Sequence, residues 1–127
     1  MRVVLDTNRY IDFCRNEPDA VAIVQRANTL LLPFVVIAEL HASFQYGTQG
    51  GKNVEVLRSF MASPRVKAAY PDEATINLYA GLYAQMRHQG TPIPTHDLWI
   101  AALVIQHNAL LATRDSHFNH IPQLMRI

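Results

Sequence analysis

The sequence predicts an α/β domain with a central parallel β-sheet. Short apolar runs recur along the chain, and segments with the apolar spacing of amphipathic helices separate them. This alternation is typical of a parallel sheet with helices packed on its faces and right-handed crossovers between its strands. At 127 residues the chain has the length of one domain with its own core, so we expect a single domain over residues 1–127.

The first expected strand is the element around which the rest of the chain is arranged. Residues 3–5 form a short apolar run closed by a polar turn, as in a buried parallel strand. Asp6 follows at the carboxyl end of this strand, which is the edge where open α/β sheets bind ligands. Thr7 and Asn8 are suited to capping a following helix. Taken alone, Asp6 could equally be only a turn residue.

Two short helices and a second strand come next. Residues 9–14 and 18–27 have helical apolar spacing, with Asp12 expected on the solvated side of the first and Pro18 suited to the first turn of the second. Residues 29–32 form another buried strand. The sheet therefore gains its second strand after a helical crossover.

The middle of the chain contains two more helices and an edge strand. Residues 34–46 form a helix ended by Gly47, and residues 53–61 form another after a glycine-rich loop. Glu39 lies within the apolar stripe of the first, where a carboxylate is costly to bury unless it is paired or binds a metal. Alternatively, Glu39 lies at the edge of the stripe and reaches water. Residues 65–69 are short and polar, as expected of an edge strand.

The last third begins with the longest helix, residues 71–89, which Gly90 stops. Its expected inward stripe, interpreted as core and not as a base-stacking platform, is Ile76, Tyr79, Ala80, Tyr83 and Met86. A helix over 96–107 is apolar on nearly every face, so we expect it to be central and buried. Thr95 is its expected N-cap, and Asp97 lies in its first turn, where the helix dipole alone would favour an acid.

Acidic residues follow the strands in a way that predicts a shared site. Two further strands complete the pattern, at residues 110–113 and 123–127. Asp115 follows the first of these as Asp6 follows the opening strand. Because parallel strands end at the same edge of a sheet, we expect Asp6, Asp115 and Glu39 to lie close together there. Whether Asp97 joins them depends on the fold, since its helix follows a loop from the opposite direction.

Four carboxylates in one cleft would repel each other strongly unless a cation neutralised them. Oxygen ligands with open coordination positions suit Mg²⁺ or Mn²⁺. With a phosphodiester substrate, such ions activate water and stabilise both the attacking and the leaving oxygen. The net charge is only +1, but setting these four acids aside leaves the rest of the chain net positive, which suits a nucleic-acid ligand. No Ser-His-Asp or Cys-His arrangement stands out.

Four short motifs contain these acids: VLDTN at residues 4–8, IAEL at 37–40, DLWIAA at 97–102 and LATRDSHF at 111–118. In this order and spacing they resemble the motifs of PIN-domain ribonucleases, in particular the VapC-type toxins of prokaryotic toxin–antitoxin pairs. The resemblance implies a PIN-like fold, with a central parallel β-sheet of four to five short strands flanked by helices. It also implies metal-dependent cleavage of RNA, a homodimer and inhibition by a VapB-like antitoxin.

The resemblance assigns roles to particular residues. The catalytic and metal-binding acids would be Asp6, Glu39, Asp97 and Asp115. Candidates for orienting ligands or water are Thr7, Asn8 and Thr113. Some members of the family carry another acid one to three residues after the fourth, where this chain has Ser116, His117 and Phe118, so the number of ions stays open. The helices between residues 34 and 61 would offer the antitoxin an apolar groove, and another face would form the dimer.

Other interpretations fit less well. A receiver domain requires an adjacent acidic pair after the first strand and a lysine after the last, and a haloacid dehalogenase-type phosphatase requires an acid where Asn8 stands. A zinc site from His96, His117 and His120 would lack a cysteine partner. Arg9, Lys52 and Arg114 are candidates for phosphate contacts, but surface charge is the favoured interpretation of each. A non-catalytic PIN-fold binding module is the alternative from a different class, and the four intact acids argue against it.

The composition indicates the compartment. Half of the residues are apolar and 17% are charged, as in ordinary globular proteins. No apolar stretch is long enough to span a bilayer, and no signal peptide is recognisable at the N-terminus. Cys14, the only cysteine, cannot form an internal disulfide and is interpreted as a helix packing residue. We therefore expect a cytoplasmic protein without a membrane partner.

Overall fold

The computed structural model describes all 127 residues and contains a five-stranded sheet in the order β3-β2-β1-β4-β5. The strands are β1 (Arg2–Leu5), β2 (Thr29–Pro33), β3 (Val66–Ala69), β4 (Leu110–Ala112) and β5 (Met125–Arg126). Every neighbouring pair is parallel, and β1 lies in the centre. The predicted α/β class and the edge position of the third strand are confirmed.

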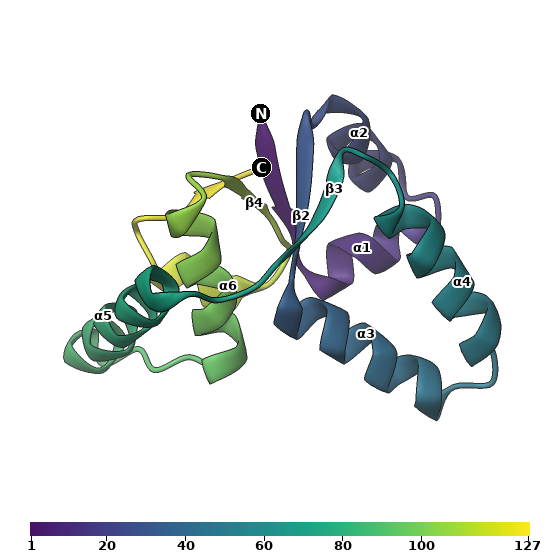
Figure 1. The fold of residues 1–127 in the computed structure, drawn as a ribbon. Helices are drawn as coiled ribbons and strands as arrows, with labels where there is room; N and C mark the ends of the chain where they lie inside the picture. The colour runs from purple at the N-terminus through teal and green to yellow at the C-terminus, as the bar shows by residue number, and fades with distance from the viewer.

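Six α-helices and one short 3₁₀ helix connect the strands. They are α1 (Thr7–Cys14), α2 (Pro18–Arg26), α3 (Phe34–Tyr46), α4 (Gly50–Met61), α5 (Glu73–Gln89), α6 (Thr95–Gln106) and the 3₁₀ helix η1 (Ser116–His120). Figure 1 shows α1 to α4 on one side of the sheet and α5 and α6 on the other. None of these helices is long and apolar enough to cross a membrane.

The core is built from the central strands and from α6. The apolar residues of β1 are at most 1% exposed, and α6 is buried on most of its circumference, with Leu98 and Leu103 inaccessible or nearly so. The predicted central, buried helix is therefore confirmed. Each such leucine contributes about 1.5–3 kcal/mol through removal of its apolar surface from water. This rigid centre holds the carboxyl edge of β1 in place.

Two helix starts differ from the expectation. The N-cap of α1 is Asp6 itself, whose carboxylate accepts a hydrogen bond from the backbone N–H of Arg9 at 2.9 Å, so the expected capping by the two residues after it is wrong. Thr95 is the first residue of α6 and not its N-cap. Pro94 precedes it, and no side chain caps this helix. The helix dipole there is complemented only by Asp97 in the first turn.

The start of α4 also lies earlier than predicted, at Gly50 within the glycine-rich loop. Here α4 approaches the end of α3 so closely that a Cβ at Gly50 would collide with the backbone oxygen of Phe44. The loop is therefore shorter than the sequence suggested, because glycine permits this approach.

The buried face of α5 is only partly the predicted one. Met86 is buried as expected and Tyr79 is half-buried, but Ile76 is 55% and Tyr83 is 41% exposed. Thr75 is fully buried instead, because its hydroxyl hydrogen-bonds to Gln106 of α6. With Thr75 on the face of α5 that packs against α6, Ile76 and Tyr83 face solvent. Ala80 is exposed as well, so the core interpretation is wrong for these three side chains.

Candidate functional site

A small cavity of about 80 Å³ collects the predicted acids. It is lined by Asp6, Thr7, Asn8, Glu39, Asp97, Ile100, Asp115 and Phe118. All four acids are therefore brought together, and the open question about Asp97 is resolved because α6 begins beside this edge of the sheet. No lysine or arginine lines the cavity. We call this cavity the acidic cleft.

Asp6 is the most deeply placed acid of the cleft, at 5% exposure. Besides capping α1, it accepts a hydrogen bond from the hydroxyl of Thr113. The same hydroxyl oxygen accepts the backbone N–H of Asp115 at 2.9 Å, so Thr113 joins two of the acids. Burial raises the pKa of Asp6 above its ordinary value, the hydrogen bond from Thr113 opposes the rise, and the charge of Asp115 adds to it.

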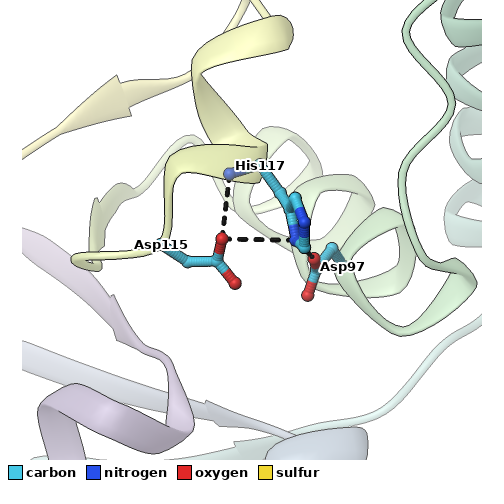
Figure 2. A group of neighbouring side chains, drawn as sticks. All are labelled: Asp97, Asp115 and His117. Carbon is cyan, nitrogen blue, oxygen red and sulfur yellow. Dashed lines mark hydrogen bonds and ion pairs between the residues drawn. The ribbon is translucent and has the colours of Figure 1, made fainter.

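Asp97 and Asp115 both contact Nδ1 of the His117 ring (Figure 2). The Nδ1 atom of His117 is 2.8 Å from Oδ2 of Asp97 and 3.2 Å from Oδ1 of Asp115. Asp97 is 8% exposed, and burial raises its pKa, against the effect of the hydrogen bond to His117. Among groups of three or more His, Cys, Asp and Glu side chains, only this one has all its ligand atoms within 4.8 Å of one another.

Glu39 lies at the mouth of the cleft. Its side chain is 49% exposed, and its Oε2 atom is 3.0 Å from Nε2 of His96 on α6. Of the two interpretations left open, the structure favours a carboxylate that borders the acidic cleft and also reaches water. Thr7 and Asn8 line the cleft as the first residues of α1. The three histidines weighed as a zinc site do not form one group.

Asp12 is not on the solvated side of α1, as the helical pattern suggested, but 8% exposed. Arg114 donates two hydrogen bonds to its carboxylate, from Nε at 2.8 Å and from Nη2 at 3.0 Å. Its Oδ2 atom is also 3.3 Å from Nη1 of Arg9. These bonds lower the pKa of Asp12, chiefly through Arg114. Since Arg114 stands between Thr113 and Asp115, the ion pair fastens α1 to the segment that carries Asp115 and Phe118 of the acidic cleft.

The sequence offered no signal for this pair, because Asp12 and Arg114 lie 102 positions apart and each looks like ordinary surface charge. The sequence gives only a weak signal for the role of His117. This residue lies two positions after Asp115, in the stretch where some members of the family carry a further acid. Arg9 and Arg114, weighed as phosphate contacts, are both engaged in ion pairs with Asp12.

A larger cavity of about 440 Å³ lies between α1, α3 and α4, and we call it the helical groove. Its lining residues are Tyr10, Ile11, Cys14, Arg15, Leu40, Ser43, Phe44, Lys52, Asn53 and Val56. The expected apolar groove between residues 34 and 61 is therefore present, with α1 as its third wall. Cys14 is exposed at this groove and does not have the packing role we expected.

Comparisons with known proteins agree with this architecture. The chain matches the PIN domain family over residues 3–124. The ribonuclease VapC1 of Haemophilus influenzae (strain R2866) is 34% identical, over 98% of this chain and 95% of that protein. The solved structure of VapBC-1 from nontypeable Haemophilus influenzae aligns with a TM-score of 0.87 and 28% identity, covering 100% of this chain and 97% of the other. VapBC2 from Rickettsia felis, bound to a promoter DNA fragment, aligns with a TM-score of 0.85 and 25% identity, covering 100% and 98%.

Proposed function

Since this chain belongs to the PIN-domain family, as a VapC-type member, we propose that it is a divalent-metal-dependent endoribonuclease and the toxin of a VapBC-type pair. The observation that carries the proposal is the acidic cleft, in which four carboxylates line one small cavity at the carboxyl edge of the sheet. A relative that aligns over 95% of its own length is named a ribonuclease, which supports RNA as the substrate.

The acidic cleft fits a hard divalent cation. Asp6 and Asp97 are almost withdrawn from water, and no lysine or arginine lines the cavity to neutralise them. About 10–15 Å³ of free space suffices for one water molecule, so about 80 Å³ leaves room for an ion and a few waters. Asp6, Asp97 and Asp115 would hold Mg²⁺ or Mn²⁺. Such an ion supplies Lewis-acid stabilisation of the phosphodiester oxygens and activation of the attacking water.

The remaining polar residues would orient the reacting groups. Thr113 holds Asp6 and Asp115 in fixed positions relative to each other through its two hydrogen bonds. Glu39, half-exposed at the mouth, is placed to accept a hydrogen bond from the attacking water or to add to the ligand set. Thr7 and Asn8 are placed to orient water beside Asp6. Phe118, 1% exposed, closes one wall of the cleft against bulk solvent.

The alternative is a PIN fold retained only to bind a partner. Burial raises the pKa of both Asp6 and Asp97, so keeping them charged near neutral pH costs stability in the absence of a cation. A binding module would be stabilised by losing one of these acids. This cost agrees with the main reason why we favour the nuclease, which is that all four acids are present in one cleft.

The proposal is tested with purified protein and total cellular RNA, which avoids guessing a target. We expect cleavage with Mg²⁺ or Mn²⁺, its loss on adding a chelator and its return when excess ion is restored. Cleavage that resists the chelator would contradict the metal-dependent mechanism. Absence of both cleavage and metal binding would leave the binding module. Gel analysis of the RNA and calorimetry of the ion measure the two properties separately.

A VapB-like antitoxin is the proposed occupant of the helical groove. Its wall is largely apolar, with Arg15 and Lys52 among the lining residues, so the fitting segment would carry apolar anchors flanked by acidic side chains. The likeness to solved VapBC complexes over the full chain supports this partner.

Val56→Asp is therefore expected to weaken antitoxin binding at least about tenfold, because it places a charge in the apolar wall. RNA cleavage by the free toxin should not change, since Val56 lies outside the acidic cleft. The dissociation constant is measured with the antitoxin co-expressed from the same locus. Ala22→Asp, at an exposed position of α2, is the matched control. Equal binding by both variants would place the antitoxin elsewhere.

We further propose a cytoplasmic homodimer. Ile76 and Tyr83 are exposed one above the other on α5, with Tyr79 half-buried between them. An apolar stripe of this kind suits a second copy of the chain. Sedimentation of the free toxin measures the oligomeric state.

A further inference from the structure

We propose that His117 is itself a ligand of the metal ion, through its Nδ1 atom, and that the site consequently favours Mn²⁺ over Mg²⁺. This inference rests on the proposed function, because the ion is the one held in the acidic cleft. It adds a nitrogen ligand to a site otherwise composed of oxygen atoms.

The spacing of the three ligand atoms is the first argument. Nδ1 of His117 is 2.8 Å from Asp97 Oδ2 and 3.2 Å from Asp115 Oδ1. An octahedral ion with ligands at about 2.1 Å places neighbouring ligand atoms about 3 Å apart. Figure 2 shows Nδ1 of His117 turned towards an oxygen of each carboxylate. Both distances from Nδ1 are thus those of neighbouring positions in one coordination shell, and one ligand atom from each of the three residues lies within 4.8 Å of the others.

The second argument is that the backbone fixes His117 in this place. Its N–H donates to Oδ1 of Asp115 at 2.9 Å, where Asp115 caps η1. Phe118, the next residue, is 1% exposed and anchors η1 in the core. The imidazole is nevertheless 49% exposed, so an ion can reach it from solvent. The ligand is therefore positioned before the ion binds, which lowers the cost of binding.

The chemical consequence follows from ligand type. Mg²⁺ strongly prefers oxygen ligands, whereas imidazole nitrogen suits the first-row transition metals, of which Mn²⁺ also accepts carboxylates and octahedral geometry. A nitrogen in the shell therefore strengthens Mn²⁺ binding more than Mg²⁺ binding. If His117 were only a counter-ion of the two acids, an entering cation would displace it and this preference would not arise.

Pulsed electron paramagnetic resonance on the Mn²⁺-loaded protein, without RNA, tests the inference directly. We expect a ¹⁴N hyperfine coupling from a directly bonded imidazole. His117→Asn puts an amide near the place of Nδ1 and should abolish the coupling. It should also weaken Mn²⁺ about tenfold, the lower end of what removing a supporting group costs a metal site, with a smaller change for Mg²⁺. His120→Asn, in the same 3₁₀ helix and exposed, is the matched control and should keep the coupling.

A second variant guards against misfolding of the first. His117→Asp supplies a carboxylate and should bring the affinities for Mn²⁺ and Mg²⁺ closer together. Bound Mn²⁺ without nitrogen coupling, or coupling that survives in His117→Asn, would overturn the role of His117 while leaving the nuclease proposal intact. Absence of any bound Mn²⁺ in the parent protein would overturn both. Calorimetry of the two ions separates these results.

Discussion

Asp6→Asn is expected to lower RNA cleavage at least about 100-fold while leaving the fold intact. Loss of a group that merely supports a metal ligand commonly costs 10–100-fold, and Asp6 is proposed as a ligand itself. Asparagine keeps an oxygen that can accept the backbone N–H of Arg9 and so still caps α1. The change therefore removes a charge and keeps the helix cap, and it replaces the oxygen that accepts the Thr113 hydroxyl by an amide N–H donor. The rate is measured on total RNA at saturating Mn²⁺.

The same substitution is expected to have no harmful effect on the stability of the metal-free protein. Because burial raises the pKa of Asp6, a neutral amide at this position avoids the cost of desolvating a carboxylate. We expect the metal-free variant to be at least as stable as the parent in chemical denaturation. Glu55→Gln, an exposed acid on α4 paired only with Arg58, is the control and should alter neither property. Retention of more than a tenth of the activity would remove Asp6 from the metal site.

Most of the site could be located from the sequence because the topology of a parallel sheet determines where the residues after its strands lie. Acids placed just after parallel strands must arrive at one edge, so Asp6 and Asp115 were predictable from local patterns alone. Asp97 was not, since its helix enters from a loop and only the packing of α6 on the sheet brings it there. Its place came from the resemblance to a family.

The errors have a common physical cause. Helical periodicity can tell an apolar face from a polar one, but it cannot identify which polar residue has a distant partner. Asp12 looked solvated because Arg114 is remote in sequence. Thr75 was not part of the predicted inward stripe of α5, because its partner Gln106 belongs to another helix. In each case a long-range hydrogen bond decided which residue is buried. Such bonds are invisible to local spacing.

Asp12→Asn is expected to lower the free energy of unfolding by about 1–2 kcal/mol at pH 7. The value lies between those for exposed and buried ion pairs, because Asp12 is buried whereas Arg114 is 55% exposed. Asparagine retains hydrogen-bonding atoms but removes the charge that holds both Arg9 and Arg114. Chemical denaturation measures the difference. Asp19→Asn, exposed in the first turn of α2, should stay within about 0.5 kcal/mol of the parent.

The difference between parent and Asp12→Asn should disappear in acid. Arg114 holds the pKa of Asp12 below its ordinary value of 3.8, so the native state releases this proton more readily than the unfolded chain. The stabilisation is thus complete above pH 3.8 and is lost as the pH falls through the lower native value. Asp6 and Asp97, whose pKa values are raised, act with the opposite sign in both proteins. Subtracting the two stability curves therefore isolates Asp12, and a difference that does not shrink as the pH falls below 3.8 would contradict the assignment.

Asp12→Asn should also affect the acidic cleft, although Asp12 does not line it. Arg114 lies between Thr113, which bonds Asp6, and Asp115, which lies beside His117. Releasing Arg114 frees this segment from α1, so the separation of the acids becomes less fixed and ion binding should weaken. If stability falls while the affinity for Mn²⁺ is unchanged, the ion pair serves the fold alone. If both fall together, the pair is what holds the two halves of the cleft at coordination distance.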